Sequence, residues 1–70
     1  MPNTIYKVIQ IIGTSEKSWE DAARNAVETA AKSLRDLRVA EVVEHDMRLE
    51  DGKVVEFRVK LNVSFKFEDK

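Results

Sequence analysis

Hydrophobic and polar residues alternate without a break in the last third of the chain. From Lys53 to Phe67, the odd positions from Val55 onward are all apolar, and the positions between them are all polar or charged. A period of two over this length is typical of a β-strand with one covered face and one open face. We therefore predict a strand from Lys53 to Phe67.

A second strand is predicted from Thr4 to Ile12, where β-branched residues dominate and Gly13 marks the expected end. Its two faces are both substantially apolar, which is typical of a strand that is covered on both sides. One face carries Ile5, Lys7, Ile9 and Ile11, and the other carries Tyr6, Val8, Gln10 and Ile12.

A helical period follows and predicts a helix from Trp19 to Asp36. Ser18 has the chemistry of an N-cap, and Asp21 lies at the third helical position, where a capping box usually has Glu or Gln. Most of the apolar stripe is alanine, so the helix can approach a sheet closely. The stripe consists of Trp19, Ala22, Ala23, Ala26, Val27, Ala30, Ala31 and Leu34.

Another strand is predicted from Arg38 to Leu49, and it would form a hairpin with the last strand. A two-residue loop at Asp51-Gly52 would pair Glu50 with Lys53 and would place charged residues opposite the apolar face. A three-residue loop, Glu50-Asp51-Gly52, brings the apolar faces together and puts its glycine where such loops need a left-handed residue. We therefore expect the three-residue loop. It pairs Leu49 with Lys53, Met47 with Val55, His45 with Phe57, Val43 with Val59, and Glu44 with Arg58.

Together these segments predict an α+β fold of the order β-α-β-β. A three-stranded antiparallel sheet would carry one helix on one face, in a single domain over residues 1–70. The last strand would span about 50 Å, whereas the helix would span about 27 Å. Phe65 and Phe67 would therefore extend past the helix. Because a chain this short also builds only a small core, we expect the sheet to continue into other copies or to pack against them.

The composition narrows the class of protein. The chain has 12 Lys and Arg against 13 Asp and Glu, a net charge of −1, and no cysteine. Near-zero charge argues against a general nucleic-acid binder, and the lack of cysteine excludes disulfides and thiolate chemistry. No apolar run approaches the roughly 20 residues of a membrane-spanning helix, and the first residues lack the pattern of a signal peptide. We therefore expect a cytoplasmic protein with no nucleic-acid or membrane partner.

Glu44 and Asp46 are candidate ligands for a metal ion. They lie two residues apart on one strand face, and oxygen-rich pairs of this kind suit calcium or magnesium. Because calcium takes six to eight ligands, backbone groups, water or neighbouring chains would have to complete the site. The alternative is a solvent-exposed strand face on which Arg58 pairs with an acidic neighbour.

The aromatic candidates have simpler interpretations. His45 is the only histidine, and on a strand its side chain points away from Glu44 and Asp46. We expect it to be packed or hydrogen-bonded. Trp19 begins the helical stripe, so we expect it in a core or a subunit contact rather than stacked on a ligand.

Two polar residues, Thr14 and Ser15, lie shortly before the predicted helix. They could bind an anion at its N-terminus. The surrounding carboxylates, Glu16, Glu20 and Asp21, favour a cation instead. A Gly-rich phosphate loop, a nucleophile elbow and a His-rich metal motif do not occur in the sequence. We therefore expect no enzymatic activity.

Several segments of the chain resemble the dodecins. They are Val8 to Ser15, the single helix, Val39-Ala40-Glu41-Val42, and Phe57 to Phe65. The resemblance covers nearly the whole chain. It implies a β-α-β-β protomer whose curved sheet partly wraps its helix, and a hollow shell of twelve copies.

The resemblance also implies a flavin site in typical members. In these, a tryptophan after the helix stacks on the isoalloxazine ring, and a glutamine on the last strand hydrogen-bonds the ring edge. Here Val39 occupies the tryptophan position and Arg58 the glutamine position. Valine has no aromatic face, and arginine cannot both donate and accept hydrogen bonds as an amide does. We therefore do not expect flavin in the usual mode.

A smaller branch, described as calcium-binding dodecin, is more similar still. The shared segments are Ser18-Trp19-Glu20, Arg38-Val39-Ala40, Glu44-His45-Asp46-Met47, and Arg58 to Lys66. Within them, Asp46, Glu44 and Glu20 are the candidate metal ligands, chosen for their carboxylates.

The predicted function is a non-enzymatic homododecameric shell that binds or buffers a small ligand, with a divalent cation such as calcium expected first. Two alternatives stay open. One is a flavin-binding dodecin with an altered pocket for storage or sequestration, and the other is a purely structural assembly.

Overall fold

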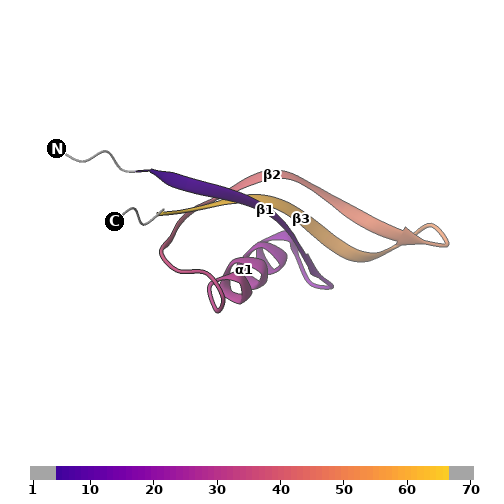
Figure 1. Ribbon diagram of the computed structural model, residues 1–70. Helices are drawn as coiled ribbons and strands as arrows, with labels where there is room; N and C mark the ends of the chain where they lie inside the picture. The colour runs from indigo at the N-terminus through magenta and orange to yellow at the C-terminus, as the bar shows by residue number, and fades with distance from the viewer. Residues whose placement is uncertain (1–4, 67–70) are drawn as a thin grey trace.

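The computed structural model describes residues 5–66 and confirms the β-α-β-β order. The elements are β1 (Tyr6–Ser15), α1 (Trp19–Ala30), β2 (Leu37–Glu50) and β3 (Lys53–Lys66). The strands form one antiparallel sheet in the order β1-β3-β2, and the sheet curves over α1, which lies against one face (Figure 1). No helix among the described residues is long and apolar enough to cross a membrane.

Strand β1 continues past Gly13, where the sequence predicted its end. Gly13 pairs with Val59, and the strand runs on to Ser15 opposite Phe57. A Cβ atom at Gly13 would lie only 2.6 Å from the Ala26 Cβ and would also collide with the Ala22 carbonyl oxygen. The glycine therefore lets α1 pack closely against the strand and does not terminate it.

Helix α1 begins as predicted and ends earlier. The backbone N–H of Asp21 donates to the Ser18 hydroxyl at 3.0 Å, so Ser18 is the N-cap. The regular helix stops at Ala30, six residues before the expected end at Asp36. Hydrogen-bonded turns replace its last part, and Asp36 takes a left-handed conformation with φ 57°. The turn directs the chain into β2, and aspartate tolerates this conformation better than most residues.

The hairpin has the two-residue loop, so the predicted three-residue loop is wrong. Glu50 pairs with Lys53, and Asp51 and Gly52 have φ values of 52° and 76°, as a type I′ turn requires. A bulge follows at once: Leu49 pairs with Val54, whereas Arg48 pairs with Glu56. One extra residue on β3 restores the match of apolar faces that the longer loop was expected to provide.

The shorter loop and the bulge together shift the hairpin register by two residues. The shift changes every predicted pair and keeps each side chain on its predicted face. The expected pairs of Met47 with Val55, His45 with Phe57 and Glu44 with Arg58 are therefore wrong. The observed pairs are Met47 with Phe57, His45 with Val59, Asp46 with Arg58, and Glu44 with Lys60, and a second irregularity occurs between Val42 and Glu44.

The core is small and lies between α1 and β3. Its fully buried residues are Ala22, Val59, Leu61 and Val63. Half-buried residues surround them on β1, α1 and β2: Ile9, Ile11, Trp19, Ala23, Ala26, Val27 and Leu37. The predicted apolar face of β3 and alanine-rich stripe of α1 thus form the core together.

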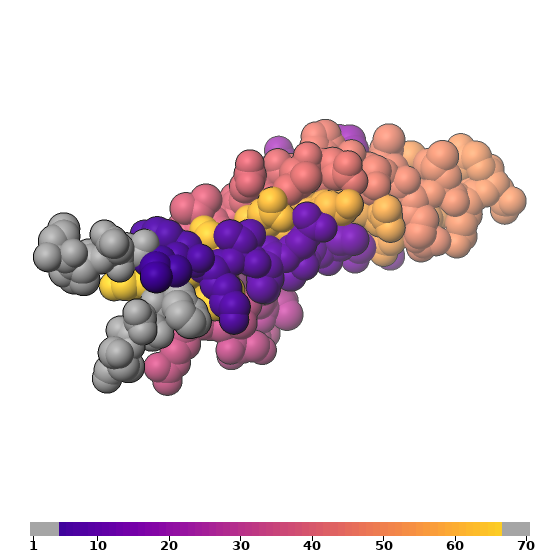
Figure 2. Space-filling model, turned by 45° about the horizontal axis from the view of Figure 1, so that its top comes forward, coloured from indigo at the N-terminus to yellow at the C-terminus, as the bar shows by residue number. Residues whose placement is uncertain are grey.

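The hairpin leaves apolar surface uncovered beyond the helix. Strand β3 has 14 residues and α1 only 12, which correspond to about 46 Å and about 18 Å. Met47, Leu49 and Val54 are 45%, 58% and 47% exposed there, and the hairpin protrudes as a narrow arm (Figures 1 and 2). Phe65 was expected to extend past the helix at the other end of β3, but it is half-buried between Lys7 and Leu37, and Phe67 lies outside the described residues.

Candidate functional site

The face of the sheet away from α1 carries the polar side chains of β3. Antiparallel pairing places them between those of β1 and β2 in rows across the sheet. The rows are Val8-Ser64-Val39, Gln10-Asn62-Glu41, Ile12-Lys60-Glu44 and Thr14-Arg58-Asp46. We call this surface the helix-free face. Both of the strand carboxylates proposed from the sequence lie on it.

Asp46 and Glu44 each pair with a cation of β3. Arg58 donates from Nε to Asp46 Oδ1 at 2.8 Å and from its terminal nitrogen to Oδ2 at 3.0 Å. The Lys60 Nζ atom lies 3.1 Å from Glu44 Oε1. Arg58 was expected to pair with Glu44, and the register reverses that assignment. The carboxylate for which Arg58 competes is therefore that of Asp46.

The Arg58 pair sets the charge state of Asp46. The hydrogen bonds from the guanidinium lower the pKa of the Asp46 carboxyl below its ordinary value of 3.8. The same contact raises the pKa of Arg58. Asp46 is therefore fully ionised at neutral pH and available to a cation that can displace Arg58.

A small hollow of about 100 Å³ lies at these two ion pairs, lined by Ile12, Glu44, Asp46, Arg58 and Lys60. Two carboxylates and two cationic side chains give it no net charge. Within residues 5–66, no three His, Asp or Glu side chains are close enough together to hold a metal ion. One protomer thus supplies at most part of the six to eight oxygen ligands that calcium takes.

Glu20 does not join this group in the protomer. It is exposed in the first turn of α1, and α1 packs on the opposite face of the sheet. A carboxylate in this position is already favoured by the helix dipole. The three proposed metal ligands therefore stay predictions, with two of them gathered on one face and the third apart.

Val39 and Arg58 share the helix-free face but lie far apart on it. Val39 is opposite Ser64 and Arg58 is opposite Asp46, a separation of six residues along β3, or about 20 Å. Val39 is 60% exposed, and Arg58 is occupied by Asp46. A pocket that used both positions would therefore need more than one protomer.

Trp19 and His45 lie on the helix side, and their rings contact each other. Trp19 packs against the core, as expected, whereas His45 is otherwise exposed in the protomer. Their ring centroids are 4.8 Å apart, and the Trp19 ring also lies 5.0 Å from Phe57 in an edge contact. The indole Nε1–H donates to the backbone carbonyl oxygen of Asp46 at 3.0 Å. Sequence reasoning missed this hydrogen bond, because it joins residues 27 positions apart and depends on the hairpin register.

The start of α1 is closed by its own side chains. The Ser15 hydroxyl donates to Asp21 Oδ2 at 2.7 Å and accepts from the backbone N–H of Lys17 at 2.9 Å. The Asn25 amide donates to the same Asp21 oxygen at 3.2 Å. The buried Ser15 thus has partners within the protein, and a negative carboxylate lies where an anion would have to bind.

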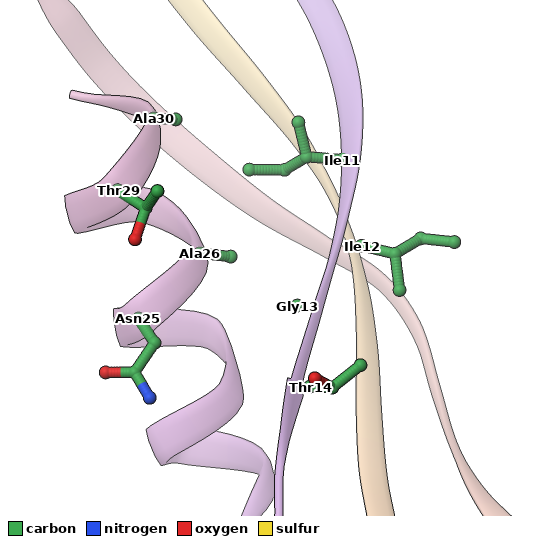
Figure 3. A pocket seen from close by; sticks show the side chains of 8 residues that line it. All are labelled: Ile11, Ile12, Gly13, Thr14, Asn25, Ala26, Thr29 and Ala30. Atoms are coloured by element: carbon green, nitrogen blue, oxygen red, sulfur yellow. The ribbon is translucent and has the colours of Figure 1, made fainter. Parts of the chain in front are cut away.

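A larger hollow, of about 410 Å³, lies between α1 and the free edge of β1. Figure 3 shows Ile11 pointing toward the helix and Ile12 pointing away from it. The lining is apolar apart from three neutral polar residues, and consists of Ile11, Ile12, Gly13, Thr14, Asn25, Ala26, Thr29 and Ala30. It has no charged group with which to hold a metal ion, so the candidate cation site remains on the helix-free face.

Comparison with known proteins bears on both the fold and the ligand. The family model for dodecins matches residues 5–68. The chain is 52% identical to the calcium dodecin of Mycobacterium tuberculosis over 63 residues, which cover 90% of this chain and 89% of that protein. It is 37% identical to a dodecin of Thermus thermophilus over 65 residues, or 93% and 94% of the two chains.

Two solved structures resemble the chain along nearly its whole length. The dodecin of Streptomyces coelicolor superposes with a TM-score of 0.91 at 37% identity and covers all of both chains. The calcium dodecin of M. tuberculosis, described as a calcium-chelating antigen with a novel calcium-binding site, superposes with a TM-score of 0.82 at 50% identity and covers 94% of each chain.

Proposed function

The chain belongs to the dodecin family, and from this premise we propose that it forms a non-enzymatic shell of identical copies that binds a divalent cation, with calcium as the expected ion. The single observation that carries the proposal is the pair of carboxylates on the helix-free face, Asp46 and Glu44, each balanced by a cation of β3. The similarity to a protein named calcium dodecin supports the same choice of ion.

We propose that the site is completed between protomers. In one chain, Glu44 and Asp46 bring two carboxylates to the hollow, whereas calcium takes six to eight oxygen ligands. A closed shell, which we expect to contain twelve copies, would repeat the helix-free face around its symmetry axes. Carboxylates from two or three copies, together with water, could then form a full coordination shell. Glu20 is the candidate that a neighbouring copy would have to contribute. We expect the shell to be cytoplasmic.

A calcium titration of thermal stability tests the proposal. A ligand that binds the folded protein but not the unfolded chain stabilises the folded state by about 2.7 kcal/mol when its concentration is a hundred times its Kd. Calcium should therefore raise the Tm of the assembled protein. Asp46→Asn should reduce that increase. Glu56→Gln is the matched control, because Glu56 also pairs with an arginine, Arg48, at 3.0 Å, but lies outside the hollow. A Tm that calcium leaves unchanged, or equal calcium effects in both variants, would contradict the proposal.

Flavin binding in an altered pocket is the second candidate. Its support is the exposed apolar surface of Val8 and Val39, which flank Ser64 from the two outer strands on the helix-free face. A yellow preparation in which flavin fluorescence is quenched would favour this candidate over the cation. An assembly that responds to neither calcium nor flavin would favour a purely structural role.

A further inference from the structure

Trp19 connects the helix to the strand that carries the candidate cation site. The sheet order β1-β3-β2 makes β2 an edge strand, and α1 packs chiefly against β1 and β3. The Trp19 side chain reaches from the first residue of α1 past Phe57 to β2. There its Nε1–H donates to the Asp46 carbonyl oxygen at 3.0 Å.

Asp46 is therefore held at two points, by groups from opposite sides of the sheet. Trp19 holds its backbone oxygen from the helix side, and Arg58 holds both carboxylate oxygens on the helix-free face at 2.8 and 3.0 Å. A two-point contact between a guanidinium and a carboxylate is strong only when the carboxylate is correctly oriented. Its orientation depends on the backbone to which it is attached.

We propose that Trp19 is a positioning residue for Asp46: its indole N–H fixes the Asp46 backbone, so that the carboxylate meets Arg58, or a cation that replaces Arg58, in one defined orientation. The part that concerns the cation rests on the proposed function. The part that concerns Arg58 does not, because the contact exists without any ion.

The indole ring is itself well oriented for this task. His45 and Phe57 lie against it with centroid distances of 4.8 and 5.0 Å and interplanar angles of 55° and 69°. The contacts with these two rings restrict the orientation of the indole, so that its N–H points at the Asp46 carbonyl oxygen. A phenyl ring at position 19 would keep part of this packing and would lose the donor.

The sharpest test removes only the N–H. β-(3-Benzothienyl)alanine, a tryptophan analogue with sulfur in place of the indole nitrogen, is incorporated at position 19 of the full chain, beside Trp19→Phe. The calcium-free readout is the Arg58 Nε–H signal in NMR and its rate of hydrogen exchange. We expect exchange to be about 2- to 10-fold faster without the indole donor, which is the effect of weakening one hydrogen bond of ordinary strength. Phe57→Leu, which keeps the donor and trims the packing, should change this rate less.

Two outcomes would overturn the positioning role. One is an Arg58 Nε–H exchange rate that is the same with and without the indole N–H, in protein of unchanged helix content. The other is equal effects of the sulfur analogue and Phe57→Leu, which would indicate packing alone.

A second readout is the calcium-induced rise in Tm, which should be smaller in the sulfur analogue than in the unmodified protein. If calcium has no effect even on the unmodified protein, the proposed function fails, and with it the part of the inference that concerns the cation. The Arg58 result would still decide the calcium-free part, so the two failures are distinguishable.

Discussion

Asp46 accepts two hydrogen bonds from Arg58 on a surface where both side chains are about half exposed. Water screens such a pair, so its direct contribution to stability is small. Its importance is local, because it keeps Asp46 ionised and occupies both of its oxygens. A cation that binds Asp46 therefore competes with Arg58 for the same two oxygens. Glu44, held by the single contact from Lys60, is the less restrained carboxylate of the two.

The lowered pKa of Asp46 predicts how stability depends on pH. Because the folded protein binds the Asp46 proton less readily than the unfolded chain, the pair favours folding above the ordinary pKa of 3.8. That contribution is lost as the pH falls through the lower folded pKa. In the Asp46→Asn variant, the unfolding free energy should therefore decrease less as the pH falls below about 4. Urea unfolding at a series of pH values measures this, and a variant in which this decrease is unchanged would contradict it.

Flavin affinity gives a second prediction for single residues. Val39→Trp together with Arg58→Gln should raise it, because stacked aromatic rings contribute about 0.5–1.5 kcal/mol beyond burial and glutamine restores an amide. Since the two positions are about 20 Å apart in one protomer, the gain should appear only in the assembled protein. A fluorescence titration of assembled and dissociated protein checks this. Tight flavin binding by the unmodified chain would refute it.

At the scale of elements, the contact between α1 and β1 depends on the lack of a side chain at Gly13. Ala22 and Ala26 of the helix lie where a Cβ atom would be. The closeness buries Ala22 completely and brings Asp21 within reach of Ser15. An alanine-rich helix thus compensates for its small side chains by approaching the strand closely.

Gly13→Ala should therefore be destabilising by about 1–3 kcal/mol, the usual range for overpacking. Gly52→Ala is the control, because Gly52 has open space around it and only its φ of 76° opposes a side chain. That substitution should cost about 1 kcal/mol or somewhat more. Chemical unfolding of both variants provides the comparison, and a Gly13→Ala protein as stable as the parent would show that the helix can shift.

At the scale of the whole molecule, apolar surface is distributed as in one part of a larger assembly. The protomer measures 56 × 20 × 14 Å, and only four apolar residues among those described are fully buried. Large apolar residues are about half exposed at the hairpin end and on the helix-free side of β1. They include Met47, Leu49, Val54, Tyr6, Val8 and Ile12.

Leu49→Asp should break the assembly and leave the secondary structure of the protomer in place. It is 58% exposed in one chain, so a charge there costs little until another copy covers it, and then several kcal/mol. Phe65→Asp should also dissociate the assembly, but it should damage the fold too, because Phe65 is half-buried. Sedimentation and circular dichroism together distinguish these outcomes, with Asp51→Asn at the hairpin turn as the control. A Leu49→Asp protein of unchanged mass would exclude this surface from the interface.

The sequence alone determined which side chains share a face and where the helix begins. A period of two places Val59, Leu61 and Val63 on one side of β3 and Arg58 and Lys60 on the other, in any register. Likewise, Ser18 could be predicted as the N-cap, because its hydroxyl and the backbone N–H of Asp21 are only three residues apart in the chain. For the same reason, Glu44 and Asp46 could be placed on one open face before their partners were known.

The tertiary structure decided everything that depends on pairing between distant residues. The turn at Asp51-Gly52 and the bulge after it shift the hairpin register by two residues from the predicted one. Because of this shift, Arg58 pairs with Asp46 and not with Glu44. The hydrogen bond from Trp19 to Asp46 has the same origin. Local preferences for two turns or two registers differ by little, so contacts between residues that are distant in the chain decide between them.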